Sequence, residues 1–177
     1  MGLSKSDIRI TQEFKIIVEK HPLSESINKK IVEDFRWFPF TRDITNPDGG
    51  KTNVKALQSY NDITSPSITL IKQWVINLVG TYGGSVFQVA ACWGAKYGKG
   101  DYTISHEHFP ATFAFVYFLK SPRGSSPLVF TYSGKRIKAE DGKVVIFPGN
   151  IFHHVPKNNC EGRLVLAGNL LQFTNDK

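Results

Sequence analysis

Short apolar segments that alternate with turn residues fill the second half of the chain. They are rich in β-branched and aromatic residues, which favour strands, and they span residues 85–93, 101–108, 112–120, 127–133, 143–147, 151–156 and 163–173. Strands that recur at regular spacing, with turn signals between them, are typical of β-sandwiches and barrels. The pattern therefore predicts a mainly β protein whose core is a double-sheet jelly roll.

A strand and a helix are predicted at the start of the chain. Residues 8–19 combine β-branched and aromatic side chains, and we expect them to form a strand at the edge of the main sheet. A helix capped by Ser24 or Ser26 should follow Pro22. Its apolar face is expected to consist of Ile27, Ile31, Val32 and Phe35.

A second helix is predicted to start at Ser65-Pro66 and to stop at Gly80. Proline suits the first helical position, and glycine suits the C-terminal end. The residues that recur at helical spacing are Ile68, Ile71, Trp74, Val75, Leu78 and Val79. Residues 36–64, between the helices, are rich in turn-forming and polar residues and are expected to form loops. We therefore expect N-terminal helices that support one sheet of the jelly roll.

The length and composition fit one domain. The chain has 177 residues, of which 41% are hydrophobic and 21% charged, as in ordinary globular proteins. Residues 1–177 are thus predicted to form a single domain, with an N-terminal part over 1–84 and a jelly-roll core over 85–173. No apolar run is long enough for a bilayer, and no signal-peptide pattern is present. Two cysteines without motif spacing favour a reducing setting, so a soluble cytoplasmic protein without membrane contact is expected.

The formal net charge is +7. Such a charge fits an anionic partner, such as nucleic acid or an acidic co-substrate, or it serves solubility alone. The lysines are scattered, with no basic run longer than a pair such as Lys29-Lys30. The charge therefore leaves both interpretations open.

Four of the five histidines form two clusters, and His21 lies outside them. Residues i and i+2 of a strand share a face, so His106 and His108 should point the same way and can share a divalent metal. A third ligand is available about 45 residues later, at His153 or His154. These two are adjacent and would point to opposite faces of a strand, so spacing does not choose between them. The alternative is that these histidines are part of a solvated polar face.

Arg163 opens the last apolar segment. A guanidinium among apolar residues is costly unless it is paired with an anion, and Arg is the side chain suited to a bidentate grip on a carboxylate. Arg163 is thus a candidate anion ligand, the alternative being an ordinary surface residue at the start of a strand.

Residues 93–108 contain a Trp, a Tyr-x-x-Gly turn and then His106-x-His108. They resemble the first iron motif of 2-oxoglutarate-dependent Fe(II) oxygenases, and especially a small bacterial and phage group related to the prolyl hydroxylases. Residues 142–148 followed by His153-x-Val155 resemble the second iron segment, with Arg163 ten residues further on. The resemblance covers roughly residues 85–173, and residues 52–56 are also similar to the N-terminal region of that group.

The resemblance implies a double-stranded β-helix in which His106, His108 and His153 bind Fe(II) and Arg163 binds the distal carboxylate of 2-oxoglutarate. The implied activity is oxidative decarboxylation of 2-oxoglutarate coupled to hydroxylation of a substrate by O2. It assigns the metal role to His153 rather than His154.

Two positions depart from the family pattern. His108 stands where the usual facial triad has a carboxylate, so three neutral ligands leave an Fe(II) site at +2 instead of +1. Val165 stands where many relatives have Ser or Thr, and Tyr102 or Tyr117 is a candidate to replace that hydrogen bond to the co-substrate.

Two other functions stay open. The spacing of His106, His108 and His153 also resembles that of cupins, which share the jelly roll and include three-His metal dioxygenases, although the Glu expected after the second His is absent. A non-catalytic binding or structural module is the other alternative. The substrate, whether peptide, nucleic acid or small molecule, is expected to contact loops 36–64 and 121–126, and no pattern indicates the oligomeric state.

Overall fold

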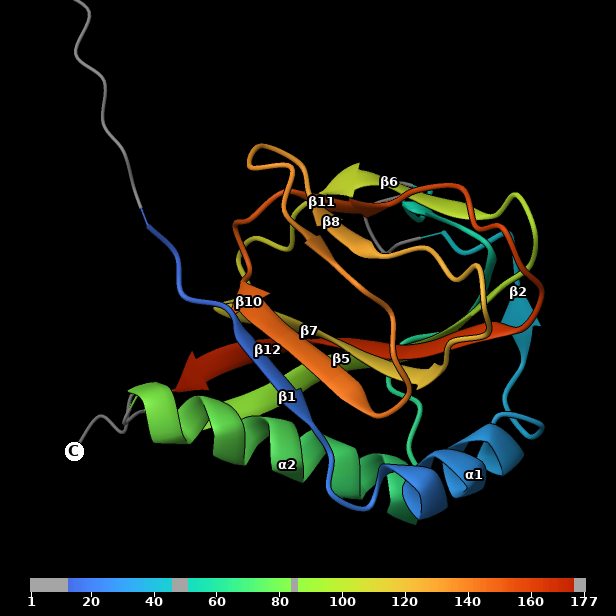
Figure 1. The fold of residues 1–177 in the computed structure, drawn as a ribbon. Helices are drawn as coiled ribbons and strands as arrows, with labels where there is room; N and C mark the ends of the chain where they lie inside the picture. The colour runs from blue at the N-terminus through green and yellow to red at the C-terminus, as the bar shows by residue number, and fades with distance from the viewer. Residues whose placement is uncertain (1–12, 46–50, 84–85, 174–177) are drawn as a thin grey trace, which may run out of the picture.

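Two antiparallel sheets face each other in the computed structural model, which describes residues 13–45, 51–83 and 86–173 (Figure 1). The larger sheet has seven strands in the order β1-β10-β7-β12-β5-β4-β2, and the smaller has five in the order β3-β6-β11-β8-β9. The prediction of a mainly β jelly roll with N-terminal helices is confirmed.

The elements follow one another in this order: β1 (Ile17–Lys20), α1 (Ser24–Asp34), β2 (Phe40–Thr41), β3 (Val54–Lys55), β4 (Leu57–Ser59), α2 (Pro66–Gly83), β5 (Val86–Tyr97), β6 (Tyr102–His106), β7 (Phe113–Lys120), β8 (Leu128–Phe130), β9 (Arg136–Ile137), β10 (Lys143–Pro148), β11 (His153–Val155) and β12 (Arg163–Phe173).

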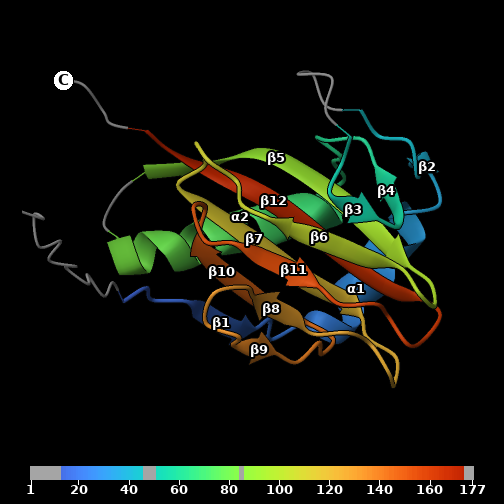
Figure 2. The same cartoon turned by 90° about the horizontal axis from the view of Figure 1, so that it is seen from above.

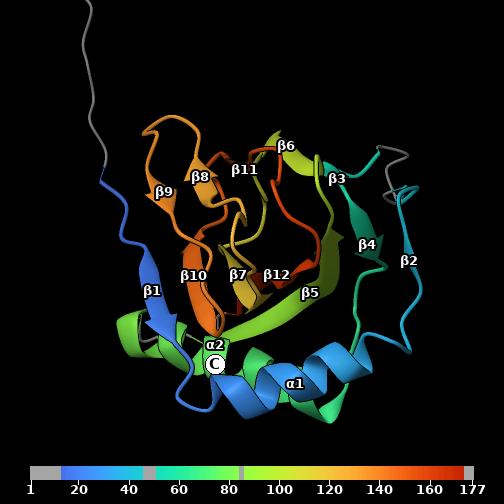
Figure 3. The same ribbon diagram turned by 45° about the vertical axis from the view of Figure 1, so that its right-hand side comes forward.

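Both helices lie against the outer face of the larger sheet (Figure 3). Ile27 and Ile31 of α1 and the predicted apolar face of α2 join one buried cluster with the outward side chains of β7, β10 and β12. No helix in the described part of the chain is long and apolar enough to cross a bilayer.

Two details of the helix prediction are wrong. The N-cap of α1 is Leu23, without a side-chain cap, instead of Ser24 or Ser26. The turn before it is closed by His21, whose Nδ1 accepts from the Leu23 N–H. α2 continues past Gly80 to Gly83, because a glycine inside a helix costs only about 1 kcal/mol and the packing of the apolar face outweighs it. The start of α2 is as predicted, with Ser65 Oγ accepting from Ile68 N.

A second cluster fills the space between the sheets. Strand β10 shows how both cores are built: Val144 and Ile146 pack toward the helices, while Val145 and Phe147 pack into the barrel. A strand buried on both faces carries an unbroken apolar run, as the sequence of β10 does. The interior of the barrel is therefore lined by alternate residues of the large sheet.

The N-terminal strand and the loop region differ from expectation. β1 covers only Ile17–Lys20 and pairs with β10 at the sheet edge, as predicted, while residues 8–12 lie outside the described residues. The expected loop 36–64 contains β2, β3 and β4, and β9 was not predicted. Strands of two or three residues are too short to show a periodic pattern, and they form here by pairing with longer strands such as β5 and β6.

Candidate metal centre

Strands β6 and β11 bring the two histidine clusters together. They are neighbours in the smaller sheet (Figure 2), and His106 pairs directly with His153. His108 follows two residues after the end of β6, where its backbone N–H donates to Gly149 O at 2.7 Å. Gly149 itself packs so closely on this loop that a Cβ would lie 2.0 Å from Ala111 O. Glycine is therefore required where the turn holds His108 in place.

A β-bulge turns His106 toward the barrel. Val155 pairs with Thr103, but His153 pairs with His106 instead of Ser105, so β6 holds one extra residue between the two pairs. Thr103 points inward, since its Oγ1 lies 2.7 Å from the hydroxyl of the buried Tyr97. In a regular strand His106 would then point outward; the extra residue reverses this, as bulges near functional sites commonly do.

The three imidazoles form a compact group. One nitrogen from each of His106, His108 and His153 lies within 4.8 Å of the other two. The ring centroids are 4.4 to 5.1 Å apart. Bonds of about 2.0–2.1 Å to a central divalent metal fit imidazole nitrogens, and side-chain rotations would be needed to bring all three within that reach. His106, His108 and His153 are thus brought together as the sequence predicted.

Backbone carbonyls fix the orientation of two of the rings. His106 Nδ1 lies 2.7 Å from Ile104 O, and His153 Nδ1 lies 2.9 Å from Ile151 O. A carbonyl oxygen only accepts, so each Nδ1 carries the proton and each Nε2 keeps its lone pair. This arrangement is the usual support of a metal-binding histidine, and the donor set fits a divalent metal.

The surroundings keep the rings uncharged. Burial, together with a smaller effect of repulsion by neighbouring imidazoles, lowers the pKa of His108 to about 2 and that of His153 to about 3. Burial also lowers the pKa of His106. Neutral imidazole is the form that ligates metals, so the group is in its binding state at neutral pH.

His154 points away from this group. Its Nδ1 lies 3.0 Å from Thr131 Oγ1, which in turn lies 2.7 Å from Ser105 Oγ. His153, in contrast, is 3% exposed and packs against Phe147 in the barrel interior. Of the two adjacent histidines, it is therefore His153 that lies with His106 and His108.

Arg163 is buried inside the same barrel. Its side chain is fully buried, with Cζ 4.4 Å from the ring centroid of Tyr97 and 5.5 Å from that of Phe118. Within the described residues, none of its three guanidinium nitrogens has a hydrogen-bond partner. Burial lowers its pKa, while Tyr97 acts in the opposite direction. A buried cation with unfilled donors is costly, so an anion beside this guanidinium would stabilise it.

Tyr97 and Phe118 are the aromatic neighbours of Arg163, and the sequence did not single them out. Both belong to the cluster between the sheets, and their rings flank the guanidinium. Tyr97 is the tyrosine of the Tyr-x-x-Gly turn before His106. The motif therefore includes this residue but does not indicate its contact with Arg163.

The two predicted co-substrate tyrosines do not lie beside Arg163. Tyr117 belongs to the core on the helix side of the large sheet, where its hydroxyl donates to Asn28 Oδ1 at 2.6 Å. Tyr102 lies on the outward face of β6 and is 37% exposed. The proposed replacement of the missing Ser or Thr by either tyrosine is therefore corrected, because strand alternation directs both away from the barrel interior.

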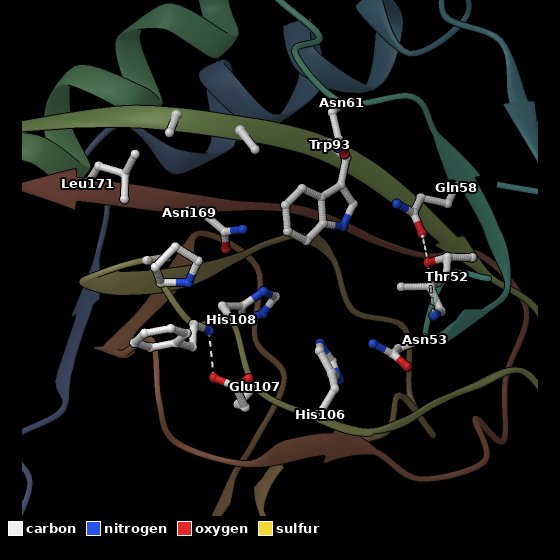
Figure 4. A pocket seen from close by; sticks show the side chains of 16 residues that line it. Thr52, Asn53, Gln58, Asn61, Trp93, His106, Glu107, His108, Asn169 and Leu171 are labelled. Atoms are coloured by element: carbon white, nitrogen blue, oxygen red, sulfur yellow. Dashed lines mark hydrogen bonds between the residues drawn. The ribbon is translucent and has the colours of Figure 1, made fainter. Parts of the chain in front are cut away.

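A cavity of about 450 Å³ opens beside the histidines (Figure 4). Its lining includes His106, His108 and Trp93, whose ring centroid is 5.9 Å from that of His108. The lining also includes the carboxamide side chains of Asn53, Gln58, Asn61 and Asn169. The cavity gives a ligand direct access to the imidazole group.

The fold is shared with solved structures of oxygenases. The 2-oxoglutarate complex of the viral collagen prolyl hydroxylase from Paramecium bursaria Chlorella virus-1 has a TM-score of 0.68 and 12% identity, over 88% of this chain and 94% of that chain. A prolyl-4-hydroxylase from Pseudomonas putida has a TM-score of 0.67 and 16% identity, over 90% and 94%. HygX from Streptomyces hygroscopicus, with nickel, 2-oxoglutarate and hygromycin B bound, has a TM-score of 0.67 and 10% identity, over 88% and 82%.

No protein-family model and no curated protein sequence matches the chain. The structural likenesses, at 10% to 16% identity, show the fold. The chain thus has the double-stranded β-helix fold seen in 2-oxoglutarate-dependent oxygenases, with its three histidines gathered beside a cavity.

Proposed function

We propose that the protein is a non-haem Fe(II) oxygenase that couples decarboxylation of 2-oxoglutarate to hydroxylation of a substrate by O2. The observation that carries the proposal is the pairing of two separate features in one barrel. Three neutral imidazoles form a metal-binding group, and a fully buried Arg163 presents guanidinium donors without partners. A metal site alone would not require the buried arginine.

In this proposal the iron would be held by His106, His108 and His153, of which His106 and His153 offer Nε2. Arg163 binds the distal carboxylate of 2-oxoglutarate, and Tyr97 and Phe118 keep its guanidinium in place by stacking. Iron with bound 2-oxoglutarate supplies the oxidation of an unactivated C–H bond by O2, with release of succinate and CO2. The chain contributes binding, orientation and exclusion of water.

The charges agree with this assignment. Three uncharged ligands leave the metal at +2, and Arg163 adds a second buried positive charge. The dianion of 2-oxoglutarate offsets charge at both places, with one carboxylate near the metal and the other at Arg163. Opposite charges in a site of low dielectric attract strongly, so the departure at His108 favours binding of a dianion.

The structural neighbours support the proposal. One is a complex with 2-oxoglutarate, and another holds nickel and 2-oxoglutarate. A cupin-type dioxygenase would use the histidines but would leave Arg163 without a role, so the oxygenase accounts for more of the site. Cys92 and Cys160 are free, which supports our proposal of an intracellular setting.

Anaerobic titration of the metal-free protein with Fe(II) and 2-oxoglutarate tests the function. We expect a weak visible charge-transfer band that requires both ligands. Binding of Fe(II) without the band would favour the cupin alternative. Absence of any metal binding would leave a non-catalytic jelly roll.

A further inference from the structure

Carboxamide side chains surround the cavity beside the histidines. Asn53 lies in the segment just before β3, Gln58 lies on β4 and Asn169 lies on β12 (Figure 4). A carboxamide offers both a donor and an acceptor. The cavity therefore presents hydrogen-bonding groups of both kinds from separate elements, beside the indole of Trp93.

Asn169 has an unused acceptor. Its Oδ1 is buried and has no hydrogen-bond partner among the described residues, although the residue lines the cavity. A buried acceptor without a donor costs free energy. A ligand with a hydroxyl or amide N–H in the cavity would supply that donor.

Gln58 is held in a fixed orientation. It is 5% exposed, and its Oε1 accepts from Thr52 Oγ1 at 2.6 Å. This bond occupies the carbonyl end, so the amide nitrogen is the end available to a ligand as a donor. Asn169 and Gln58 thus provide an acceptor and a donor from two different strands.

The lining carries little positive charge for an anion. The described residues that form it include no Lys or Arg. Glu107 adds a carboxylate, which accepts from Phe109 N. Arg42 pairs with Asp101, and Lys55, which is not a lining residue, donates from Nζ to the backbone oxygen of Thr52. Among the described residues that line the cavity, Glu107 is thus the one acidic or basic side chain apart from the histidines.

We propose that the substrate group admitted to this cavity is an uncharged polyhydroxylated ring, as in a sugar. Each sugar hydroxyl both donates and accepts, which matches carboxamides on several sides, and the C–H face of the ring can pack on Trp93. A prolyl ring offers only C–H groups at its outer edge and would leave Asn169 Oδ1 unpaired. An anionic ring would meet Glu107. This inference rests on the function proposed above, because it names the substrate class of the same site.

The test uses Zn(II)-loaded protein with 2-oxoglutarate, so that no turnover occurs. The probes are methyl glycosides of glucose, galactose and mannose, the uronide matched to each, and N-acetylprolinamide. Binding is measured by saturation-transfer NMR. We expect at least one neutral glycoside to bind, its uronide to bind at least about fivefold more weakly, and prolinamide to bind more weakly still.

Two variants locate the binding. Asn169→Leu removes the acceptor at similar size, and Gln58→Met removes the donor. Each should weaken the glycoside about five- to tenfold, the effect of losing one hydrogen bond. Asn159→Leu, at an exposed asparagine outside the cavity, should leave the affinity unchanged. The second cavity variant keeps the test decisive if the first does not fold.

Three results would overturn the sugar assignment: no glycoside binds, a uronide or prolinamide binds as well as the best glycoside, or neither cavity variant changes the affinity. The Fe(II) and 2-oxoglutarate absorption band is measured on the same preparation. A normal band without glycoside binding overturns the substrate class alone. Glycoside binding without the band overturns the proposed oxygenase function instead.

Discussion

The guanidinium of Arg163 lies over the ring of Tyr97, with Cζ 4.4 Å from the ring centroid. The residues sit directly opposite each other on β12 and β5, so the stacking is set by strand register. Stacking stabilises the cation from one side but fills none of its N–H donors. In the function that we propose, this positively charged group is held ready for the co-substrate, at a cost to the stability of the protein.

Arg163→Met should therefore separate stability from co-substrate binding. Replacing a buried, unpaired charge by an apolar side chain of similar length is often neutral or stabilising by about 1–4 kcal/mol, so the melting temperature of the metal-free protein should stay or rise. Affinity for 2-oxoglutarate should fall at least about thirtyfold, since one partner of a buried charge pair is lost. Calorimetry of unfolding and of 2-oxoglutarate binding measures the two effects.

The matched control is Arg136→Met, at an exposed position on β9, which should change neither quantity appreciably. A strong loss of stability in Arg163→Met would mean that the guanidinium has partners within the folded chain. Unchanged affinity for 2-oxoglutarate would place the co-substrate elsewhere.

Replacing His153 or His154 should have different effects on bound metal, because the two side chains lie on opposite faces of β11. His153→Ala removes an imidazole from the three-histidine group, so bound Fe(II) or Zn(II) should drop from about one per chain to near zero. His154→Ala removes a ring that points to Thr131 and should keep full loading. Elemental analysis after dialysis against metal gives both ratios. Equal loading of the two variants would contradict the site.

The chemistry of the site could be predicted from the sequence because it depends on residue types at short spacings. His106-x-His108, the second histidine pair and Arg163 are visible as polar residues in apolar strands. Their assembly also follows from neighbouring strands in a jelly roll. The sequence does not show the extra residue in β6, because a bulge exists only relative to the partner strand. Without it His106 would face outward.

Tyr117 is a second residue whose orientation the sequence does not show. A tyrosine in an apolar strand is equally compatible with either face, and β7 is buried on both. Only the packing of the helices decides that its hydroxyl meets Asn28. The short strands β2 to β4 escape prediction for a related reason, since their pairing partners rather than their own composition determine them. Carboxamides such as Gln58 reach the cavity from this part of the chain.

Tyr117→Phe should accordingly affect stability and not the co-substrate. The hydroxyl donates to Asn28 Oδ1 in a buried contact, and its removal leaves that acceptor without its donor, at a cost of about 1–3 kcal/mol. Affinity for 2-oxoglutarate should stay within about twofold of the parent protein, because the hydroxyl faces the helices. Urea denaturation and 2-oxoglutarate titration are the measurements. A large loss of affinity with unchanged stability would restore Tyr117 to the site.

The stability of the metal-free protein should fall as the pH falls below about 6.5. Burial keeps the pKa of His153 at about 3 and that of His108 at about 2, and it lowers the pKa values of His106 and His21 as well. The unfolded chain takes up protons on these histidines near pH 6.5, whereas the folded chain does not. Protons therefore favour the unfolded state. The stability present above pH 6.5 is lost progressively as the pH falls toward the pKa values of the folded state.

Each histidine that stays neutral on folding contributes a slope of up to about 1.4 kcal/mol per pH unit. Urea denaturation of the metal-free protein at pH 7.5, 6 and 5 covers the window before most carboxylates titrate. His108→Asn removes one such group from the metal centre, and His21→Gln removes one outside it, so each should make the loss shallower. A free energy of unfolding that is flat or rises from pH 7.5 to 5 would show that the imidazoles are not held neutral. In that case protons would compete with the metal for the imidazole nitrogens at a pH well above the pKa values that burial gives to these histidines.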